Sequence, residues 1–305
     1  MSSRPLSLSK SSNEMMEKIL VVGDVHGNYP KLMAALKEAG YSKGDKVYFL
    51  GDLMDRGNYN AKVANLLRRM GDDCVVIQGN HEEHHQSLMP YYRTIVSGGS
   101  VLCQVTADVF KYSKDGIRLS SLPCHKEAYL KYKCSLEKRA AILQTQTTSL
   151  EEAVRKAIVY TMAWEDSRIW EIITRLLSDL CDEPYNASKT MYEYFSATEK
   201  TRRAMEAIWN SSIRMIRLQA KTGKWYIDTN TSFDSLVLSH NNPYGLSRIS
   251  KDPMEGKNAT HTNVLHIFGH VPGDEIRMAR GTANCCYLNI DISPKRVGVI
   301  SLIRH

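Results

Sequence analysis

The sequence lacks the features of several protein classes. It contains no apolar run approaching the roughly 18 residues of a membrane helix, and no apolar segment of signal-peptide type follows its start. None of its seven cysteines forms a Cys-x-x-Cys pair, which argues against a zinc ribbon or a dithiol redox motif. It also has no internal repeat and no low-complexity block. Scattered cysteines, odd in number, are typical of a reducing compartment, so we expect a cytoplasmic protein that does not enter a membrane.

The composition is that of a globular protein with a large core. Its 305 residues suffice for one large domain or for a domain with an insertion. Hydrophobic residues make up 43% and charged residues 24%, and the formal net charge is +7. This positive charge fits an anionic substrate, and it equally fits nonspecific attraction to nucleic acid. The Ser-rich residues 1–17 are expected to form a flexible tail.

Residues 18–80 show alternating strand and helix patterns. Three runs rich in apolar and β-branched residues, Ile19–Val22, Val47–Leu50 and Cys74–Gln78, lack the polar alternation of a half-exposed strand, which indicates a parallel sheet covered on both faces. Two amphipathic segments, Tyr29–Ala39 and Asn60–Met70, lie between them and predict helices, each followed by glycine. Units of this kind bind ligands beyond the carboxyl ends of their strands.

The middle of the sequence has a different pattern. We expect a β-hairpin over residues 108–121, followed by helices near 126–145, 150–180 and 188–221. Strand patterns return after Gly223, in runs at 225–227, 236–238, 264–268, 286–290 and 297–300. The predicted fold is therefore α/β, with two packed sheets flanked by helices. Residues 18–125 and 223–305 would form this two-sheet domain, and residues 126–222 would be a helical insertion.

Polar side chains of metal-binding type follow five of the predicted strands. They comprise three histidines, two carboxylates and one amide: Asp24, His26, Asp52, Asn80, His240 and His270. Mixed nitrogen and oxygen donors suit Mn²⁺, Fe or Zn²⁺ better than thiophilic metals. Six ligands are too many for one open catalytic ion but suffice for two, bridged by a carboxylate such as Asp52. Paired ions activate a water and bind the oxygens of an in-line phosphoryl displacement.

Three motifs give these residues a family resemblance. They are Gly-Asp-Val-His-Gly at 23–27, Gly-Asp-Leu-Met-Asp-Arg-Gly at 51–57 and Gly-Asn-His-Glu at 79–82. In this order and spacing they resemble the signatures of the calcineurin-like metallophosphoesterase superfamily, in particular the phosphoprotein phosphatase branch and the related symmetrical diadenosine tetraphosphatases. Segments 238–244 and 268–272 are similar to the remaining motifs of the bacteriophage lambda type of Ser/Thr protein phosphatase. The resemblance covers about residues 18–82 and 225–305.

The resemblance implies a role for each of these residues. It implies a first metal ion held by Asp24, His26 and Asp52, and a second held by Asp52, Asn80, His240 and His270. His81 would be the general acid, oriented by Asp55, and Arg56 would bind the phosphate. The nucleophile would be a hydroxide bridging the two metals. Arg248 is the candidate for the family's second phosphate-binding arginine, although the residues around it depart from the motif.

Other histidines have a different interpretation. His125 also follows a strand-like run and competes with His240 for the second metal, but the apolar strand before His240 favours the latter. His84 and His85 are expected on the solvated face of a helix, and His266 is expected to pack or hydrogen-bond within a strand.

A basic stretch occupies residues 200–224 and includes Trp209. It could bind RNA phosphates or an acidic phosphoprotein. The favoured interpretation is an amphipathic helix in which Met205, Ile208 and Ile216 pack inward while the charges are solvated.

The sequence thus predicts a dinuclear metal-dependent phosphatase of phosphomonoesters, with phosphoserine and phosphothreonine in proteins as the first candidate substrates. Manganese is the expected metal, with iron or zinc as alternatives. The nearest rivals are a dinucleoside polyphosphate hydrolase and an RNA-end phosphatase of the same superfamily. The rival from another class is a binding module that keeps the scaffold and docks a partner through its helical region.

Overall fold

The computed structural model describes residues 17–113, 167–181, 184–220, 223–227, 232–241, 264–270, 272–280, 286–293 and 295–304. Its strands are β1 (Glu17–Val22), β2 (Lys46–Phe49), β3 (Cys74–Val76), β4 (Met215–Gln219), β5 (Trp225–Tyr226), β6 (Ser232–Phe233), β7 (Ser235–Ser239), β8 (Val264–Phe268), β9 (Arg277–Arg280), β10 (Cys286–Asn289) and β11 (Val299–Arg304). They form a six-stranded sheet, β3-β2-β1-β11-β5-β6, and a five-stranded sheet, β4-β7-β8-β10-β9. The predicted α/β class with two sheets is confirmed.

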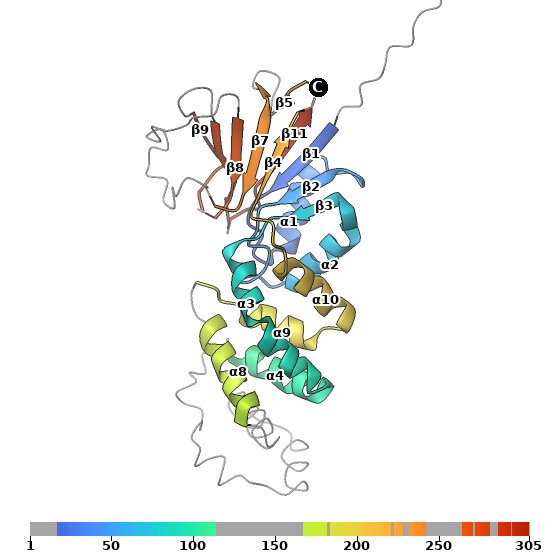
Figure 1. Cartoon of the computed structure of the whole chain (residues 1–305), viewed down its shortest axis with the longest axis vertical. Helices are drawn as coiled ribbons and strands as arrows, with labels where there is room; N and C mark the ends of the chain where they lie inside the picture. The colour runs from blue at the N-terminus through green and yellow to red at the C-terminus, as the bar shows by residue number, and fades with distance from the viewer. Residues whose placement is uncertain are drawn as a thin grey trace, which may run out of the picture.

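The described helices lie against one face of the strands and beyond their lower end (Figure 1). They are α1 (Tyr29–Glu38), α2 (Asn60–Met70), α3 (Asn80–Ser97), α4 (Ser100–Ser113), α8 (Ser167–Leu180), α9 (Ser188–Ser196) and α10 (Glu199–Trp209), with a short 3₁₀ turn, η1, at Gly71–Asp73. None of the helices in the described ranges is long and apolar enough to cross a membrane.

The first three strands explain why the early sequence is so apolar. β1 pairs in parallel with β2, and β2 pairs in parallel with β3, as the sequence predicted. Alternate residues of a strand point to opposite faces. Ile19 and Val21 of β1 therefore contribute to the core between the two sheets, while Leu20 and Val22 contribute to the core between this sheet and the helices. Both faces are buried, so the strand has no polar side.

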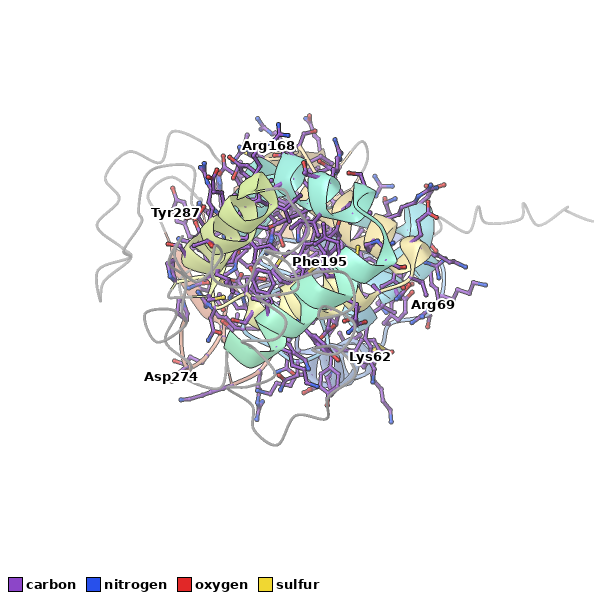
Figure 2. The ribbon with its side chains drawn as sticks, turned by 90° about the horizontal axis from the view of Figure 1, so that it is seen from below. Lys62, Arg69, Arg168, Phe195, Asp274 and Tyr287 are labelled. Atoms are coloured by element: carbon purple, nitrogen blue, oxygen red, sulfur yellow. The ribbon has the colours of Figure 1, made fainter. Side chains whose placement is uncertain are left out.

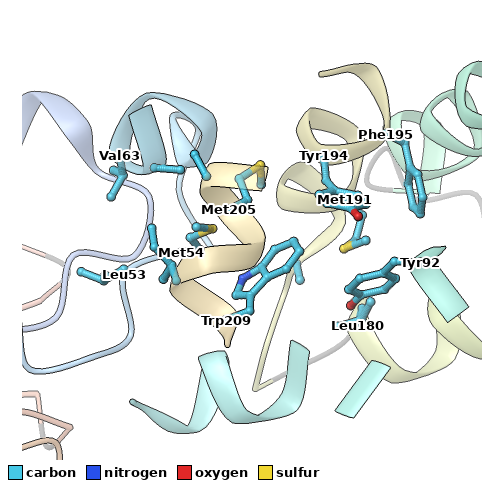
Figure 3. Close-up of a cluster of buried hydrophobic side chains, with 14 of the residues drawn as sticks. Leu53, Met54, Val63, Tyr92, Leu180, Met191, Tyr194, Phe195, Met205 and Trp209 are labelled. Carbon is cyan, nitrogen blue, oxygen red and sulfur yellow. The ribbon is translucent and has the colours of Figure 1, made fainter. Parts of the chain in front are cut away.

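On the helical side, the core that the strands share with the helices is built around aromatic side chains. Trp209, Tyr92 and Tyr194 are fully buried, and the ring centroid of Trp209 lies 5.6 Å from that of Tyr92 and 5.2 Å from that of Tyr194 (Figure 3). Seen from the helical end, Phe195 lies near the centre, whereas Lys62 and Arg69 point outward (Figure 2). Large buried aromatic surfaces contribute strongly to stability, so this cluster fixes α3, α9 and α10 beneath the sheets.

Two predictions about the middle of the chain are wrong. Residues 108–113, expected as the first arm of a hairpin, belong to helix α4; its buried Val109 and Phe110 pack in the helical core. Residues 188–221, expected as one helix, form α9 and α10 and then strand β4, which pairs antiparallel with β7. In β4 the exposed and half-buried residues alternate, which is the period of two that is typical of a strand. The sequence interpretation did not recognise this period. The second hairpin arm, the helix near 126–145 and the first part of the helix near 150–180 lie outside the described residues.

Candidate active site

The loops that follow five strands meet at one place. Asp24 and His26 follow β1, Asp52 follows β2, and Asn80 begins α3 just after β3. The two late histidines, His240 and His270, follow the parallel strands β7 and β8. The backbones of His26, Asp52 and His270 have φ values of 45°, 48° and 69°, a conformation that non-glycine residues adopt only at a cost. Such strain clusters at functional sites.

The Asp52 carboxylate lies between two groups of ligand-type atoms. Its Oδ2 is 4.0 Å from Nε2 of His26 and 3.8 Å from Nε2 of His81, while its Oδ1 is 3.4 Å from Nε2 of His240. In the second group, which comprises Asn80, His240 and His270, Nε2 of His240 is 3.0 Å from Nδ1 of His270 and 3.1 Å from Oδ1 of Asn80. In the first group, on the Oδ2 side of Asp52, Oδ2 of Asp24 is 3.8 Å from Nε2 of His26. These distances leave room for one cation in each group.

The tautomers of two histidines suit metal binding. Nδ1 of His240 donates to the carbonyl of Leu50 at 2.8 Å, and Nδ1 of His26 faces the carbonyl of Met54 at 3.3 Å. Each Nε2 therefore presents a lone pair to the site. In metal centres, ligating histidines are commonly oriented in this way, by a hydrogen bond from the other ring nitrogen. Burial lowers the pKa of His26 to about 3 and also lowers the pKa of His240, so both rings are neutral.

The buried carboxylates need a cationic partner. Burial, and next the charge of Asp52, raises the pKa of Asp24 well above its ordinary value, and burial also raises the pKa of Asp52. A divalent cation favours the ionised form of such groups. The structure also shows why glycines flank them: a Cβ on Gly79 would lie 2.3 Å from Oδ1 of Asp52, and one on Gly269 would lie 2.3 Å from Oδ1 of Asp24. The donor set therefore fits two divalent ions.

His81 belongs to a buried hydrogen-bonded series. Its Nδ1 donates to Oδ2 of Asp55 at 2.7 Å, and the same carboxylate accepts from Nε2 of His85 at 3.0 Å. Burial acts to lower the pKa of His81, but the hydrogen bond and charge of Asp55 outweigh it and raise that pKa. For Asp55, burial acts to raise the pKa, but the charge of His85 and hydrogen bonds from both histidines bring it well below its usual range. His81 thus keeps a proton toward neutral pH.

The expectation that His85 is solvated is wrong. Its ring is fully buried, stacks on Trp209 at 4.4 Å between centroids, and directs Nδ1 to the hydroxyl of Tyr92 at 2.8 Å. The spacing from His81 to His85 is i to i+4, which places both rings on one helix face, and this signal was present in the sequence. His84, in contrast, is only half-buried. Its ring stacks on that of Tyr185 at the edge of the site, with the centroids 3.9 Å apart.

The guanidinium of Arg56 lies beside the rings of His26 and His81. Its Nη1 is 3.1 Å from Nε2 of His26, and its Nη2 is 3.4 Å from Nε2 of His81. Nε and Nη2 also donate to the carbonyl of Pro184, at 3.2 and 3.0 Å, and the backbone N–H of Arg56 donates to the carbonyl of Asn186 at 3.2 Å. Because Arg56 is exposed on its outer side, it can present donors to an incoming anion.

Two residues that support the site were missed by the sequence interpretation. The Glu82 carboxylate accepts hydrogen bonds from the backbone N–H groups of Asp52, Leu53 and Gly79, at 2.8, 2.9 and 3.0 Å. Asn60 likewise accepts from the N–H of Asp55 through Oδ1 at 2.9 Å. Glu82 is the last residue of the third motif, so the motif itself carried this signal. Nothing in the local sequence marks Asn60.

Three further candidates have different outcomes. His125 and Arg248 lie outside the described residues, so their assignments stay predictions. His266 is buried within β8 and packs against Tyr287 with ring centroids 5.4 Å apart.

Comparison with known proteins agrees with this geometry. Residues 17–139 match the model of the calcineurin-like phosphoesterase family. A serine/threonine-protein phosphatase of Caenorhabditis elegans is 27% identical over 32% of this chain and 28% of its own. Symmetrical bis(5′-nucleosyl)-tetraphosphatases of Enterobacter sp. (strain 638) and Cronobacter sakazakii are each 37% identical over 21% of this chain and 23% of their own. The chain therefore spans about a quarter of the length of these curated relatives.

A crystal structure described as a diadenosine tetraphosphatase aligns with 94% of this chain and 90% of its own, at 11% identity and a TM-score of 0.40. That likeness is too low to contribute to the assignment. The family match over residues 17–139 contains all three motifs, so this part of the chain is similar to the calcineurin-like phosphoesterases in sequence.

Proposed function

We propose that this chain is a dinuclear metal-dependent hydrolase of phosphomonoesters. One observation carries the proposal: the Asp52 carboxylate lies between two histidine-containing groups, beside a His81 that Asp55 holds at 2.7 Å. That arrangement supplies sites for two cations, a proton donor and, through Arg56, a cationic group for the phosphoryl oxygens. The family match supports the same reaction class.

The residues of the site divide the work of the reaction. Asp24, His26 and Asp52 would hold one ion, and Asn80, His240 and His270 would join Asp52 in holding the other. We propose that both ions are Mn²⁺. Two bound divalent ions would lower the pKa of a water so that it can attack phosphorus. Arg56 would orient the phosphoryl group through paired N–H donors. His81 would protonate the leaving oxygen from Nε2, while Asp55 holds Nδ1 and so fixes the direction of that proton.

The first candidate substrates are phosphoserine and phosphothreonine in proteins, and the phosphatase relative supports this choice. The tetraphosphatase relatives support a dinucleoside polyphosphate as the second candidate, and an RNA end is a third. A side-by-side assay of a phosphopeptide, a dinucleoside tetraphosphate and a 3′-phosphorylated RNA would rank them. Each assay should include the Asp52→Asn and His81→Asn variants. Full activity in both variants would refute the proposed chemistry.

The helical region is proposed to set access to this site. In support, the carbonyl of Pro184 and the ring of Tyr185 lie against Arg56 and His81, the latter with ring centroids 5.1 Å apart. The basic stretch offers less support for nucleic-acid binding, because Arg203 pairs with Glu199 and Arg214 pairs with Glu83. We keep residues 126–222 as the proposed insertion, with β4 as the part of it that joins the second sheet.

A non-catalytic binding module is the rival from another class. It predicts that the purified chain holds no metal and hydrolyses aryl phosphates at the background rate. The complete set of candidate ligands argues for the enzyme. A cytoplasmic location stays a proposal, supported by the scattered cysteines of the sequence, which are odd in number.

A further inference from the structure

A cavity of about 260 Å³ adjoins the proposed catalytic site. His26 and Arg56 form part of its wall, and the remainder comes from the start of α1, from Pro272 and from the segment that leads into β11. Its volume is far above the roughly 10–15 Å³ that a single water requires. The cavity is therefore large enough for a ligand, and it shares His26 and Arg56 with the proposed catalytic site.

The cavity is lined by cations from three separate parts of the chain. Lys31 comes from α1, Arg56 from the loop after β2, and Arg296 from the segment before β11. The amide of Asn28 and the hydroxyl of Ser293 add polar groups, and no Asp or Glu is among the lining residues that the structure describes. Clustered charges of one sign beside low-dielectric walls attract an ion of the opposite sign. The ligand that fits is an anion.

Arg56 connects this cavity with the site of hydrolysis. Its Nη1 lies 3.1 Å from Nε2 of His26, a ring that faces both the Asp52 carboxylate and the cavity. A phosphoryl group bound at the metal site and contacted by Arg56 would thus lie next to an anion-binding space. An anionic group joined to it through one oxygen could then enter the cavity that Lys31 and Arg296 line.

We propose that the cavity binds a second phosphoryl group of the substrate, bonded through oxygen to the one that is hydrolysed. This inference rests on the proposed function and extends it from phosphomonoesters to phosphoanhydrides. Water attacks the terminal phosphorus, the P–O bond to the second phosphoryl group breaks, and that group leaves as part of the monophosphate product. A substrate with two consecutive phosphoryl groups binds better than the matching monoester. The positions that provide this preference are Lys31 and Arg296, neither of which belongs to the three motifs.

Adenosine 5′-monophosphate and adenosine 5′-diphosphate test the proposal, because their compositions differ only by the second phosphoryl group. The hydrolysed bond also changes, from an ester to an anhydride, so the change of the ratio in the variants is the decisive measurement. With the manganese-loaded full chain, kcat/KM for the diphosphate should exceed that for the monophosphate by about tenfold, the value of one good charged hydrogen bond. Lys31→Gln and Arg296→Gln should each reduce this ratio about five- to tenfold, mainly through the KM of the diphosphate. Lys37→Gln, on the same helix, and Lys295→Gln, which removes the partner of Asp274, are the matched controls and should keep the ratio.

Three outcomes overturn the inference. They are an equal kcat/KM for both nucleotides, an unchanged ratio in Lys31→Gln and Arg296→Gln, and a fall of the same size in the controls. Failure of the proposed function would look different, because the wild-type chain would then hydrolyse neither nucleotide nor any aryl phosphate. In that case isothermal titration calorimetry of the two nucleotides decides, since tighter binding of the diphosphate that Arg296→Gln abolishes still supports the subsite. A preference for phosphopeptides with an adjacent glutamate, without a nucleotide preference, would assign the cavity to an acidic side chain instead and refute the proposal.

Discussion

The carbonyl of Pro184 accepts two hydrogen bonds from the guanidinium of Arg56, one from Nε at 3.2 Å and one from Nη2 at 3.0 Å. These residues are 128 positions apart in the chain. The contact uses one edge of the guanidinium and leaves Nη1 directed toward His26. The segment at Pro184 therefore determines where the proposed phosphate-binding group of the second motif points.

This relationship predicts an effect of substitutions at Asn186, whose carbonyl accepts from the backbone of Arg56 and whose φ is 48°. A β-branched residue adopts that conformation at a cost of about 1–2 kcal/mol, so Asn186→Val should displace the segment and raise the KM for a phosphate ester several-fold. Asn186→Gly tolerates the same φ and is the matched control. Steady-state kinetics and metal analysis test this. A normal KM in Asn186→Val would show that Arg56 does not depend on this segment.

Removing the partner of His81 should change the pH profile. Asp55 raises the pKa of His81, so the protonated form persists to higher pH, and kcat/KM falls as the pH rises through that raised pKa. In Asp55→Asn the pKa should drop, so the loss of activity should begin at a lower pH. Loss of general acid catalysis should cost about 10²–10⁴-fold with a poor leaving group.

The leaving group supplies the control for that experiment. A nitrophenolate needs little protonation, so Asp55→Asn and His81→Asn should be much less impaired on nitrophenyl phosphate than on an alkyl phosphate. An equal loss on both substrates would mean that the pair acts on binding or on folding instead.

The second metal site should depend on His240. Its Nε2 lies within 3.1 Å of both Asn80 and His270, so His240→Ala removes the atom at the centre of that group. We expect the bound metal to fall from about two ions per chain to about one, with activity at least 100-fold lower. Mass spectrometric metal analysis of His240→Ala beside His125→Ala provides the comparison. Unchanged metal content in the first variant, with loss in the second, would transfer the role to His125.

Adjacent glutamates should differ sharply in their effect on stability. The buried Glu82 accepts three backbone hydrogen bonds, whereas Glu83 is largely exposed and pairs with Arg214 at 2.8 Å. Glu82→Ala leaves three donors without their acceptor and should lower the free energy of unfolding by about 3 kcal/mol or more. Glu83→Ala should lower it by less than about 1 kcal/mol. Urea denaturation in a chelator measures both without a contribution from bound metal. Similar losses in the two variants would contradict the assigned role of Glu82.

The outcome of sequence-based prediction depended on how local each signal was. The βαβ segment and the α2 boundaries were predicted well, because apolar periodicity and terminal glycines are local features. β4 was taken as helix, because its five residues were interpreted as a continuation of the basic amphipathic stretch before them. The antiparallel partner that makes them a strand, β7, is about 20 residues further along the chain.

The sequence by itself determined which side chains meet at the strand ends. Each motif follows an apolar run, and parallel pairing brings the carboxyl ends of such runs to one edge. Only the tertiary structure decided that Pro184 holds Arg56 and that Lys31 and Arg296 share a cavity. Those relationships join distant segments through burial and hydrogen bonding, and no local pattern of residues encodes them.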